Sequence, residues 1–241
     1  MLILKIIFNF WQLDILGAAL FDYITASSRA DSNLGPRGPV KSVTGGSPGF
    51  WIAKRLFDVC LSLLLLPLLM LFSLILVLLN PFWNRGALFY TQIRMGRDCV
   101  PFAAIKFRTM RPLSGGKRGY NDPIEDDRIT MLGRAMRKSR IDELPQIINV
   151  LKGDMSLIGP RPDCYEHAIE YLRIIPDYRA RHIVRPGISG LAQITVGYVE
   201  NVDGTARKVA ADLSYIADAG FRLEARLFVG TLRTIVTCVG A

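Results

Sequence analysis

The feature that most constrains this chain is an uncharged, apolar run of 21 residues, Val59 to Leu79, whose only interruption is Pro67. As a straight helix the run would be roughly 30 Å long, which matches the hydrocarbon core of a bilayer. Pro67, however, removes one helical hydrogen bond, and its ring clashes with the preceding turn. A helix broken there has arms of about 12 and 18 Å, and each is too short to cross a membrane.

Basic residues stand on both sides of this run. Lys54 and Arg55 precede it, and Arg85, Arg94 and Arg97 follow it. Positive flanks favour the cytoplasmic side, so both ends are expected on that side. The sequence therefore predicts a re-entrant helix with its kink at Pro67. The flanks and the proline leave open a kinked helix that spans the membrane once.

The rest of the chain divides around this helix. Residues 1–24 are apolar but contain charges, which fits an interfacial or docking segment better than a spanning helix, and residues 25–49 are rich in Ser, Gly and Pro, as in a linker. We predict an N-terminal segment plus linker over 1–49, a membrane helix over 50–82 and one domain over 83–241. A length of 241 residues suits one domain with a membrane element.

A β-hairpin is predicted directly after the membrane helix. Residues 87–93 and 101–109 have strand-like composition, and residues 96–98 resemble a turn. Lys106 and Arg108 would project from one face of the second strand. Such a face could bind phosphate, or it could be a solvated edge strand protected by its charges.

Helical patterns account for most of the remaining chain. Ile129, Leu132 and Met136 recur at helical spacing among basic residues, which predicts an amphipathic helix that lies on anionic headgroups or shows a solvated face. Further helices are predicted over residues 145–152, 165–174, 206–216 and 223–239. The fold class is thus α+β, mostly helical, with interfacial amphipathic helices.

The charge of the chain is concentrated in one segment. Residues 85–140 hold 13 Lys and Arg against 5 Asp and Glu, whereas the whole chain has a net charge of +9. Such an excess suits an anionic membrane, a phosphorylated substrate or nucleic acid. The chain lacks recognition-helix, RNA-binding and zinc signatures, so we expect no nucleic-acid partner. The 4 cysteines form no C-x-x-C pair, so neither a zinc site nor a disulfide framework is predicted.

Two adjacent carboxylates, Asp142 and Glu143, stand just ahead of Pro145. Proline is favoured at the first position of a helix, and a helix N-terminus stabilises nearby negative charge. This placement predicts that Asp142 is ionised. An ordinary helix start would explain the same residues. Further along, Pro160 and Pro162 restrict where Arg161 can point.

The order of these segments resembles the bacterial sugar transferase family, the monotopic phosphoglycosyl transferases that act on polyprenyl phosphate. The resemblance covers about residues 50–235 and leaves the N-terminal extension unmatched. Each motif is weak alone, but their joint order is specific. The motifs are Lys54-Arg55-Leu56-Phe57-Asp58, Lys106-Phe107-Arg108-Thr109-Met110, Asp142-Glu143-Leu144-Pro145-Gln146, the segment from Asn149 to Ser156, Gly159-Pro160-Arg161-Pro162 and Pro186-Gly187-Ile188-Ser189-Gly190.

The resemblance implies a reaction and roles for the carboxylates. Family members transfer a sugar 1-phosphate from a nucleotide sugar, here expected to be a UDP-sugar, to undecaprenyl phosphate. Asp142 matches the nucleophile that forms a phosphosugar aspartyl ester, and carboxylates are established covalent nucleophiles. Glu143 matches the ligand for Mg²⁺, which prefers carboxylate and phosphate oxygens. The family's re-entrant helix is bent at a proline, which corresponds here to Pro67.

Four basic residues are candidates for binding phosphate: Lys106, Arg108, Arg140 and Arg161. Arg161 is the strongest of them, because arginine suits bidentate phosphate contacts and its neighbours are prolines. Structural salt bridges are the ordinary alternative. At Arg140 the chain departs from the serine expected in the family, which puts the local substrate contact in doubt but not the carboxylate pair.

Together these features predict an enzyme on the cytoplasmic face of the bacterial inner membrane that initiates exopolysaccharide, capsule or O-antigen type glycan assembly. Its partners would be the nucleotide sugar, undecaprenyl phosphate and the lipid bilayer; a homodimer stays open. The competing hypothesis is a non-catalytic, membrane-anchored interaction protein on the same fold. The sequence leaves open the identity of the sugar, the function of residues 1–49, and whether Gln193 and Asp212 approach the nucleotide or metal.

Overall fold

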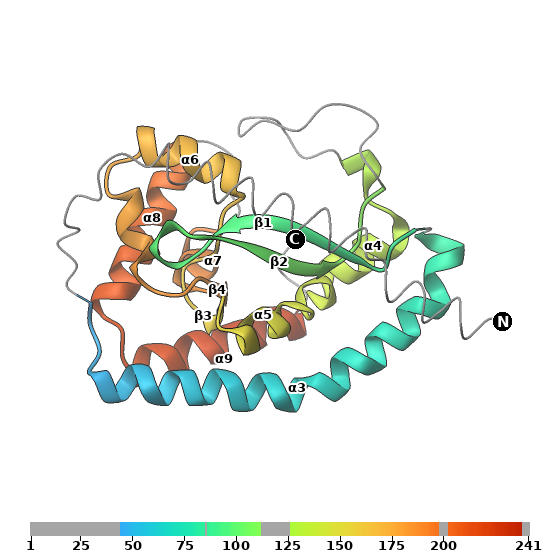
Figure 1. Cartoon of the computed structure of the whole chain (residues 1–241), viewed down its shortest axis with the longest axis horizontal. Helices are drawn as coiled ribbons and strands as arrows, with labels where there is room; N and C mark the ends of the chain where they lie inside the picture. Colours follow the sequence, from blue (N-terminus) through green and yellow to red (C-terminus); the bar gives the residue numbers. More distant parts are fainter. Residues whose placement is uncertain (1–43, 85, 112–125, 198–201, 238–241) are drawn as a thin grey trace.

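The computed structural model describes residues 44–84, 86–111, 126–197 and 202–237 (Figure 1). The predicted apolar segment over 1–24, and most of the predicted linker, lie outside the described residues. Residues 112–125 also lie outside them.

The apolar run forms the middle of one long helix, α3 (Pro48–Trp83). Ser47 caps its N-terminus by accepting a hydrogen bond from Phe50 N at 3.2 Å, and Pro48 occupies the first turn, where its missing N–H costs nothing. The helix continues through Pro67, so the prediction of a break there was too strong. Figure 1 shows that α3 instead bends near its middle, in the part that contains Pro67. With 36 residues, α3 is long and apolar enough to cross a membrane.

The two faces of α3 differ in polarity. One face packs on the domain and is buried, and it includes several polar residues. The other face exposes large apolar side chains, among them Leu64 and Met70, each 73% exposed. An exposed apolar surface this continuous marks an interaction site, and along the uncharged run of α3 it suits lipid. The buried face consists of Phe50, Lys54, Asp58, Ser62, Leu69, Ser73, Leu76 and Asn80.

Both ends of α3 are bonded to the same domain. Near its start, Lys54 Nζ lies 2.8 Å from Glu224 Oε2 on α9 (Phe221–Thr237). At its C-cap, Asn84 Nδ2 donates to Arg108 O at 2.6 Å, just after the second strand of the hairpin. The helix therefore runs along one side of the domain, as Figure 1 shows, and does not project from it.

The predicted hairpin is confirmed. Strands β1 (Phe89–Met95) and β2 (Pro101–Phe107) pair antiparallel, with Tyr90 opposite Lys106. The connection contains the short helix η1 (Arg97–Cys99), in which Asp98 adopts a left-handed conformation.

A second, parallel pair of strands was not predicted. β3 (Ser156–Ile158), just before the Gly159–Pro162 motif, pairs with β4 (Gly187–Ser189), which lies within the Pro186–Gly190 motif. A Cβ atom on Gly187 would lie 2.1 Å from Gly159 N, so only glycine permits this approach of the two backbones. Strands of three residues are too short to show a period of two.

The predicted helices are confirmed, with small shifts at their ends. Helix α5 ends at Gly153, which has φ +95°, and α4 begins after Thr130, whose hydroxyl accepts from Gly133 N at 3.0 Å. Short 3₁₀ helices connect several of the elements. The helices after the hairpin are η2 (Asp126–Arg128), α4 (Met131–Lys138), η3 (Ile141–Glu143), α5 (Gln146–Lys152), α6 (Tyr165–Ile174), η4 (Tyr178–Ile183), α7 (Leu191–Thr195), α8 (Val202–Ala217) and α9 (Phe221–Thr237).

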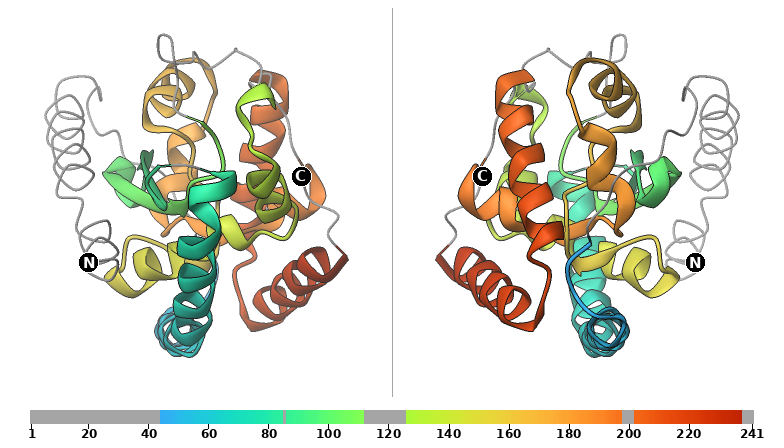
Figure 2. Two further views of the ribbon diagram at one scale, coloured as in Figure 1. Left: turned by 90° about the vertical axis from the view of Figure 1, so that its right-hand side faces the viewer. Right: turned by 90° about the vertical axis from the view of Figure 1, so that its left-hand side faces the viewer.

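Helices α3 and α9 share one side of the molecule (Figures 1 and 2). They contact each other through Phe57 and Phe228, whose ring centroids are 5.5 Å apart. Outer apolar residues of α9, including Phe221 and Val229, are exposed. The two helices together form an apolar base under the domain, as expected for a surface that meets lipid.

The core above this base has two main parts. Leu69 and Leu76 of α3 pack with Phe107 and Ile147, which joins the long helix to the hairpin and α5. On the far side of the hairpin, Met95 packs with a set of residues from α6 and η4, including Tyr165 and Tyr178. The hairpin thus lies between two apolar clusters.

His182 connects η4 to the hairpin turn. Its Nδ1 lies 3.1 Å from Gly96 O, so this nitrogen carries the proton and donates. Burial, reinforced by the nearby Arg181 charge, lowers the pKa of His182 to about 3. The folded protein therefore holds this imidazole neutral.

We expect His182 to make the protein less stable as the pH drops below 6.5, because an unfolded histidine binds a proton there and the folded one does not, whereas the raised pKa values of Asp142 and Asp212 act in the opposite direction. His182 contributes a loss of about 1.4 kcal/mol for each pH unit below that value. Thermal unfolding in detergent at about pH 7.5 and pH 5.5 measures this loss of stability. His182→Gln should reduce this pH dependence, whereas the control His167→Gln should retain it. An undiminished pH dependence in His182→Gln contradicts the assignment.

Candidate active site

The two adjacent carboxylates lie on η3, in the connection between α4 and α5. Both are buried, with Asp142 7% and Glu143 6% exposed. Arg140 caps η3 in a left-handed conformation with φ +59°, which costs a non-glycine residue about 1 to 2 kcal/mol. Such a strained backbone is typical of functional sites.

Glu143 is bound by two cations that come from different parts of the chain. Lys106 Nζ on β2 lies 2.7 Å from Oε1, and Arg161 donates to both carboxylate oxygens. Although burial opposes its ionisation, Arg161 and Lys106 hold the pKa of Glu143 well below its usual range. Glu143 is therefore a fully paired, buried anion.

The position of Lys106 is fixed by Asn149 on α5. The side chain of Asn149 accepts from Ile105 N at 3.0 Å and donates to Ala103 O at 2.8 Å. These two bonds fix the register of β2 against α5, the helix that follows Glu143. Burial lowers the pKa of Lys106 to about 8, against the opposing effect of Glu143.

The position of Arg161 is fixed by the backbone around it. Arg161 Nη1 donates to Ile188 O on β4 at 3.2 Å. Arg181 donates to Arg161 O at 2.8 Å, and Arg94 donates to Pro162 O at 2.6 Å. Two further arginines thus hold the turn from which Arg161 reaches Glu143.

Arg181 is the centre of a buried ion network behind this turn. It is 3% exposed and pairs with Asp163 and, at 2.7 Å, with Asp212. Tyr178 also donates to Asp163, at 2.6 Å. Four residues of this region were not predicted from sequence as site residues, namely Arg94, Asp163, Tyr178 and Arg181. The one available signal was the location of Asp163 directly after the Gly159–Pro162 motif.

Asp142 differs from its neighbour in being poorly paired. Its Oδ1 is buried, and in the described structure this atom has no hydrogen-bond partner. Burial, together with the charge of Glu143, raises the pKa of Asp142 to about 6. These effects outweigh the predicted stabilisation of its charge by a helix N-terminus, although a pKa of about 6 still leaves Asp142 mostly ionised at pH 7. Helix α5 begins only at Gln146, so Asp142 lies outside its first turn, and burial has the larger effect.

The other two candidate cations occupy different places. Arg140 Nη1 lies 3.9 Å from Glu143 Oε2 at the edge of the site. Arg108 follows the end of β2, and its guanidinium donates to Asn84 O at the end of α3. The structure thus brings Lys106, Arg140 and Arg161 to Glu143, and it bonds Arg108 to the long helix.

Gln193 and Asp212 also fall in different places. Gln193 Nε2 donates to Ile188 O at 3.3 Å, the same carbonyl that accepts from Arg161, and Gln193 Oε1 is buried without a partner among the described residues. Gln193 therefore adjoins the site. Asp212 belongs to the network of Arg181 behind it.

Chemically, the site combines a buried carboxylate that has a free oxygen with two cations 2.7 Å or less from the adjacent carboxylate. A carboxylate with an unpaired oxygen can attack an electrophile, and Lys and Arg side chains can neutralise the oxygens of a phosphoryl group. Within the described residues, no group of three or more His, Cys, Asp or Glu side chains could hold a metal alone. A metal here would need ligands from a substrate.

The sequence matches a model of bacterial sugar transferases over residues 50–238. A UDP-N-acetylgalactosamine-undecaprenyl-phosphate N-acetylgalactosaminephosphotransferase from Aeromonas hydrophila is 41% identical over 198 residues, which are 81% of this chain but 46% of that protein. A UDP-glucose:undecaprenyl-phosphate glucose-1-phosphate transferase from Caulobacter vibrioides is 37% identical over 215 residues, 85% of this chain and 79% of the relative. The exopolysaccharide production protein PSS of Rhizobium leguminosarum bv. phaseoli is 34% identical over 195 residues, 77% and 96% of the two chains.

We expect Arg181→Gln to destabilise the protein by about 3 to 5 kcal/mol, because it leaves the buried carboxylates of Asp163 and Asp212 without their cation. Chemical denaturation in detergent measures the change. Arg179→Gln, on the same short helix, is the matched control and should cost less than about 1 kcal/mol. Equal stability of the two variants would show that the network does not support the turn.

Proposed function

The chain belongs to the bacterial sugar transferase family, and from this membership we propose that it transfers a sugar 1-phosphate from a UDP-sugar to undecaprenyl phosphate. The observation that carries the proposal is the asymmetry of the carboxylate pair. Glu143 is bound by Lys106 and Arg161, whereas Asp142 keeps a buried oxygen without a partner in the described structure. A buried oxygen without a hydrogen-bond partner calls for an explanation, and a role as nucleophile supplies one for Asp142.

In the first step Asp142 attacks the β-phosphorus of the UDP-sugar. A bond forms between its carboxylate oxygen and phosphorus, the bond from that phosphorus to the bridging oxygen breaks, and UMP leaves with the electron pair. Lys106 and Arg161 are positioned to bind the phosphate oxygens, which would otherwise repel the carboxylate. The product on the enzyme is a phosphosugar ester of Asp142.

In the second step an oxygen of undecaprenyl phosphate attacks the same phosphorus. The ester bond to Asp142 breaks, which restores the carboxylate and releases undecaprenyl diphosphate sugar. Burial of Asp142 supports this order, because a site with little water protects the ester from hydrolysis.

Mg²⁺ fits this site only with help from the substrate. The adjacent carboxylates offer oxygens of the type it prefers, but both oxygens of Glu143 already accept from cations. Mg²⁺ is commonly held by one or two carboxylates together with substrate phosphates. We propose that Glu143 is its protein ligand when the diphosphate is bound. The ion would supply further neutralisation of the phosphate charge.

The biological product follows from the chemistry proposed. A lipid-linked sugar diphosphate is a starting point for glycan assembly, and one relative is named for exopolysaccharide production. We propose that the chain initiates an exopolysaccharide, capsule or O-antigen type glycan. The relatives are named for different sugars, N-acetylgalactosamine and glucose, so membership of the family does not select the donor.

The same proposal includes a re-entrant topology on the cytoplasmic face. A helix that spans a bilayer separates its ends by roughly 30 Å of hydrocarbon. Here Lys54, near one end of α3, and Asn84, at the other, bond to the same domain. A bend near Pro67 and an apolar outer face support entry into the membrane and return on the same side.

We expect Asp142→Asn to abolish UMP release, by at least about a thousandfold, because an amide cannot form the ester. The assay supplies Mg²⁺, undecaprenyl phosphate and a panel of UDP-sugars. Asp218→Asn, an exposed site on the loop after α8, is the control and should retain activity. Full turnover by Asp142→Asn would remove the nucleophile from the proposal, and the panel identifies the donor.

For topology, single cysteines at Gly49 and Asp98, in a chain without its natural cysteines, should both react with an impermeant thiol reagent only from the cytoplasmic side. Both positions are exposed, and they lie on either side of the apolar run. Labelling after detergent is added is the control for reactivity. Reaction of Gly49→Cys from the periplasm would instead establish a spanning helix.

A further inference from the structure

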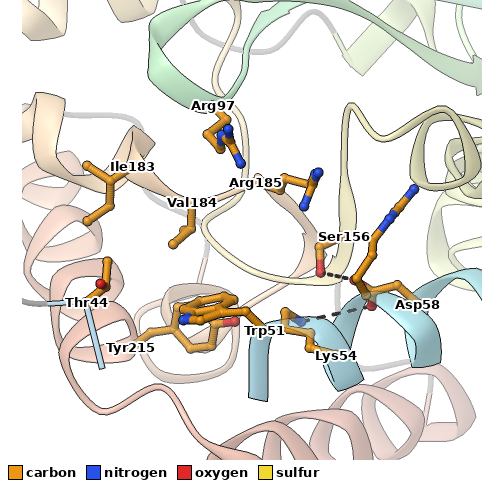
Figure 3. Close-up of a pocket in the computed structure, with 11 residues that line it drawn as sticks. Thr44, Trp51, Lys54, Asp58, Arg97, Ser156, Ile183, Val184, Arg185 and Tyr215 are labelled. Atoms are coloured by element: carbon orange, nitrogen blue, oxygen red, sulfur yellow. Dashed lines mark hydrogen bonds and ion pairs between the residues drawn. The ribbon is translucent and has the colours of Figure 1, made fainter. Parts of the chain in front are cut away.

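A second basic site lies away from the carboxylate pair, in a cavity of about 240 Å³ between the first turns of α3, β3 and the segment before β4. Four basic residues line this cavity, Lys54, Arg55, Arg97 and Arg185, against a single acidic one, Asp58. Figure 3 shows Arg97 and Arg185 on one side and Trp51, Lys54 and Tyr215 on the opposite side.

The acidic residue of the cavity already accepts hydrogen bonds from the protein itself. Asp58 accepts from Ser156 Oγ at 2.7 Å and from Leu157 N at 3.2 Å, which holds β3 against α3. Lys54 is likewise neutralised, because it pairs with Glu224 at 2.8 Å. The charge balance of the cavity therefore depends on its three arginines.

These arginines lack carboxylate partners inside the cavity. Arg55 donates to two backbone oxygens, and Arg185 Nε donates to Gly153 O at 2.9 Å. In the part of the chain that the structure describes, only Arg97 of the three forms an ion pair, with exposed Asp98. Burial and the charges of Arg55 and Arg97 lower the pKa of Arg185, against the opposing effect of Asp58.

The cavity lies where α3 approaches the membrane. Trp51, Lys54 and Arg55 stand just before the charge-free run that begins at Val59. Tryptophan and basic residues at such a boundary are typical of the headgroup layer of a bilayer. An anion bound here would thus be at the depth of lipid phosphates.

The geometry points to a binding site for the phosphate headgroup of an anionic membrane lipid, held by Arg55, Arg97 and Arg185. We propose phosphatidylglycerol as a representative ligand. The cavity is smaller than the roughly 300 to 1,000 Å³ typical of sites for drug-sized ligands, so it suits a headgroup better than a nucleotide sugar. Guanidinium groups bind phosphate by charge-assisted, bidentate hydrogen bonds.

This site differs from the catalytic one in its residues, because neither the carboxylate pair nor the cations that bind Glu143 line the cavity. Ser156 of β3 faces Asp58 and the cavity, whereas Ile188 O of β4 accepts from Arg161 in the candidate active site. A lipid bound in the cavity would join α3 to β3 and the segment before β4. It would thereby fix the height of the domain above the membrane.

Native mass spectrometry of the whole chain in detergent tests this proposal, by titration with phosphatidylglycerol and with phosphatidylcholine of the same acyl chains. The unchanged protein should bind phosphatidylglycerol at least about fivefold more tightly. Arg97→Glu should reduce that affinity at least about fivefold, whereas Arg97→Lys, which keeps the charge but loses the bidentate contact, should reduce it less. Arg97 is exposed and pairs only with its neighbour among the described residues, so these variants should fold.

Arg207→Glu, an exposed residue of α8, is the matched control for charge reversal and should not weaken binding. Unchanged affinity in Arg97→Glu, or an equal loss in Arg207→Glu, would overturn the site. Displacement of the lipid by equal concentrations of glycerol 3-phosphate would contradict lipid as the ligand and indicate that the cavity binds a soluble phosphate compound. The proposal rests on α3 lying in the membrane, but it does not require catalysis. Asp142→Asn should therefore bind phosphatidylglycerol normally, which separates the two tests.

Discussion

The buried charge of Glu143 is the constraint on which the architecture of this site depends. A carboxylate removed from water is costly unless it is paired, and the structure pairs it twice. The partners come from β2 and from the turn before α6, so the one anion requires the hairpin, η3 and that turn to meet. Asn149 fixes the position of β2, which carries Lys106, and Arg181 fixes the backbone of Arg161. Asp142 is buried together with Glu143 because the two residues are adjacent in sequence. This explains why burial has the largest effect on the pKa of Asp142.

The long helix was predictable from sequence in composition but not in its contacts. The uncharged run, its proline and its basic flanks indicate a membrane helix with a bend, and these are local properties of the chain. The face that packs on the domain depends on residues more than a hundred positions away, such as Glu224. The sequence also overstated the effect of Pro67, because packing of Leu69 and Leu76 against the core supports the helix beyond it.

The candidate site was also predicted only in part, because some of its contacts join residues that are far apart in the sequence. The motif order identified the family and singled out Asp142, Glu143, Lys106 and Arg161, and the structure brings these side chains together. Alternation along a strand placed Arg108 beside Lys106, but β2 ends at Phe107 and Arg108 turns to Asn84. The network of Arg181 could not be predicted, since its members are scattered over α8, η4 and a turn, and no spacing links them.

The polar residues buried along α3 have a consequence for how the protein is made. Lys54 and Asp58 bond to α9 and β3 of the folded domain, and Asn80 bonds to the chain just after the helix. An α3 that formed before the domain would leave these polar groups without their partners on β3, α9 and the following loop. The final contacts of α3 can therefore form only as the domain folds. The helix is thus an integral part of the domain and not an anchor joined to a finished one.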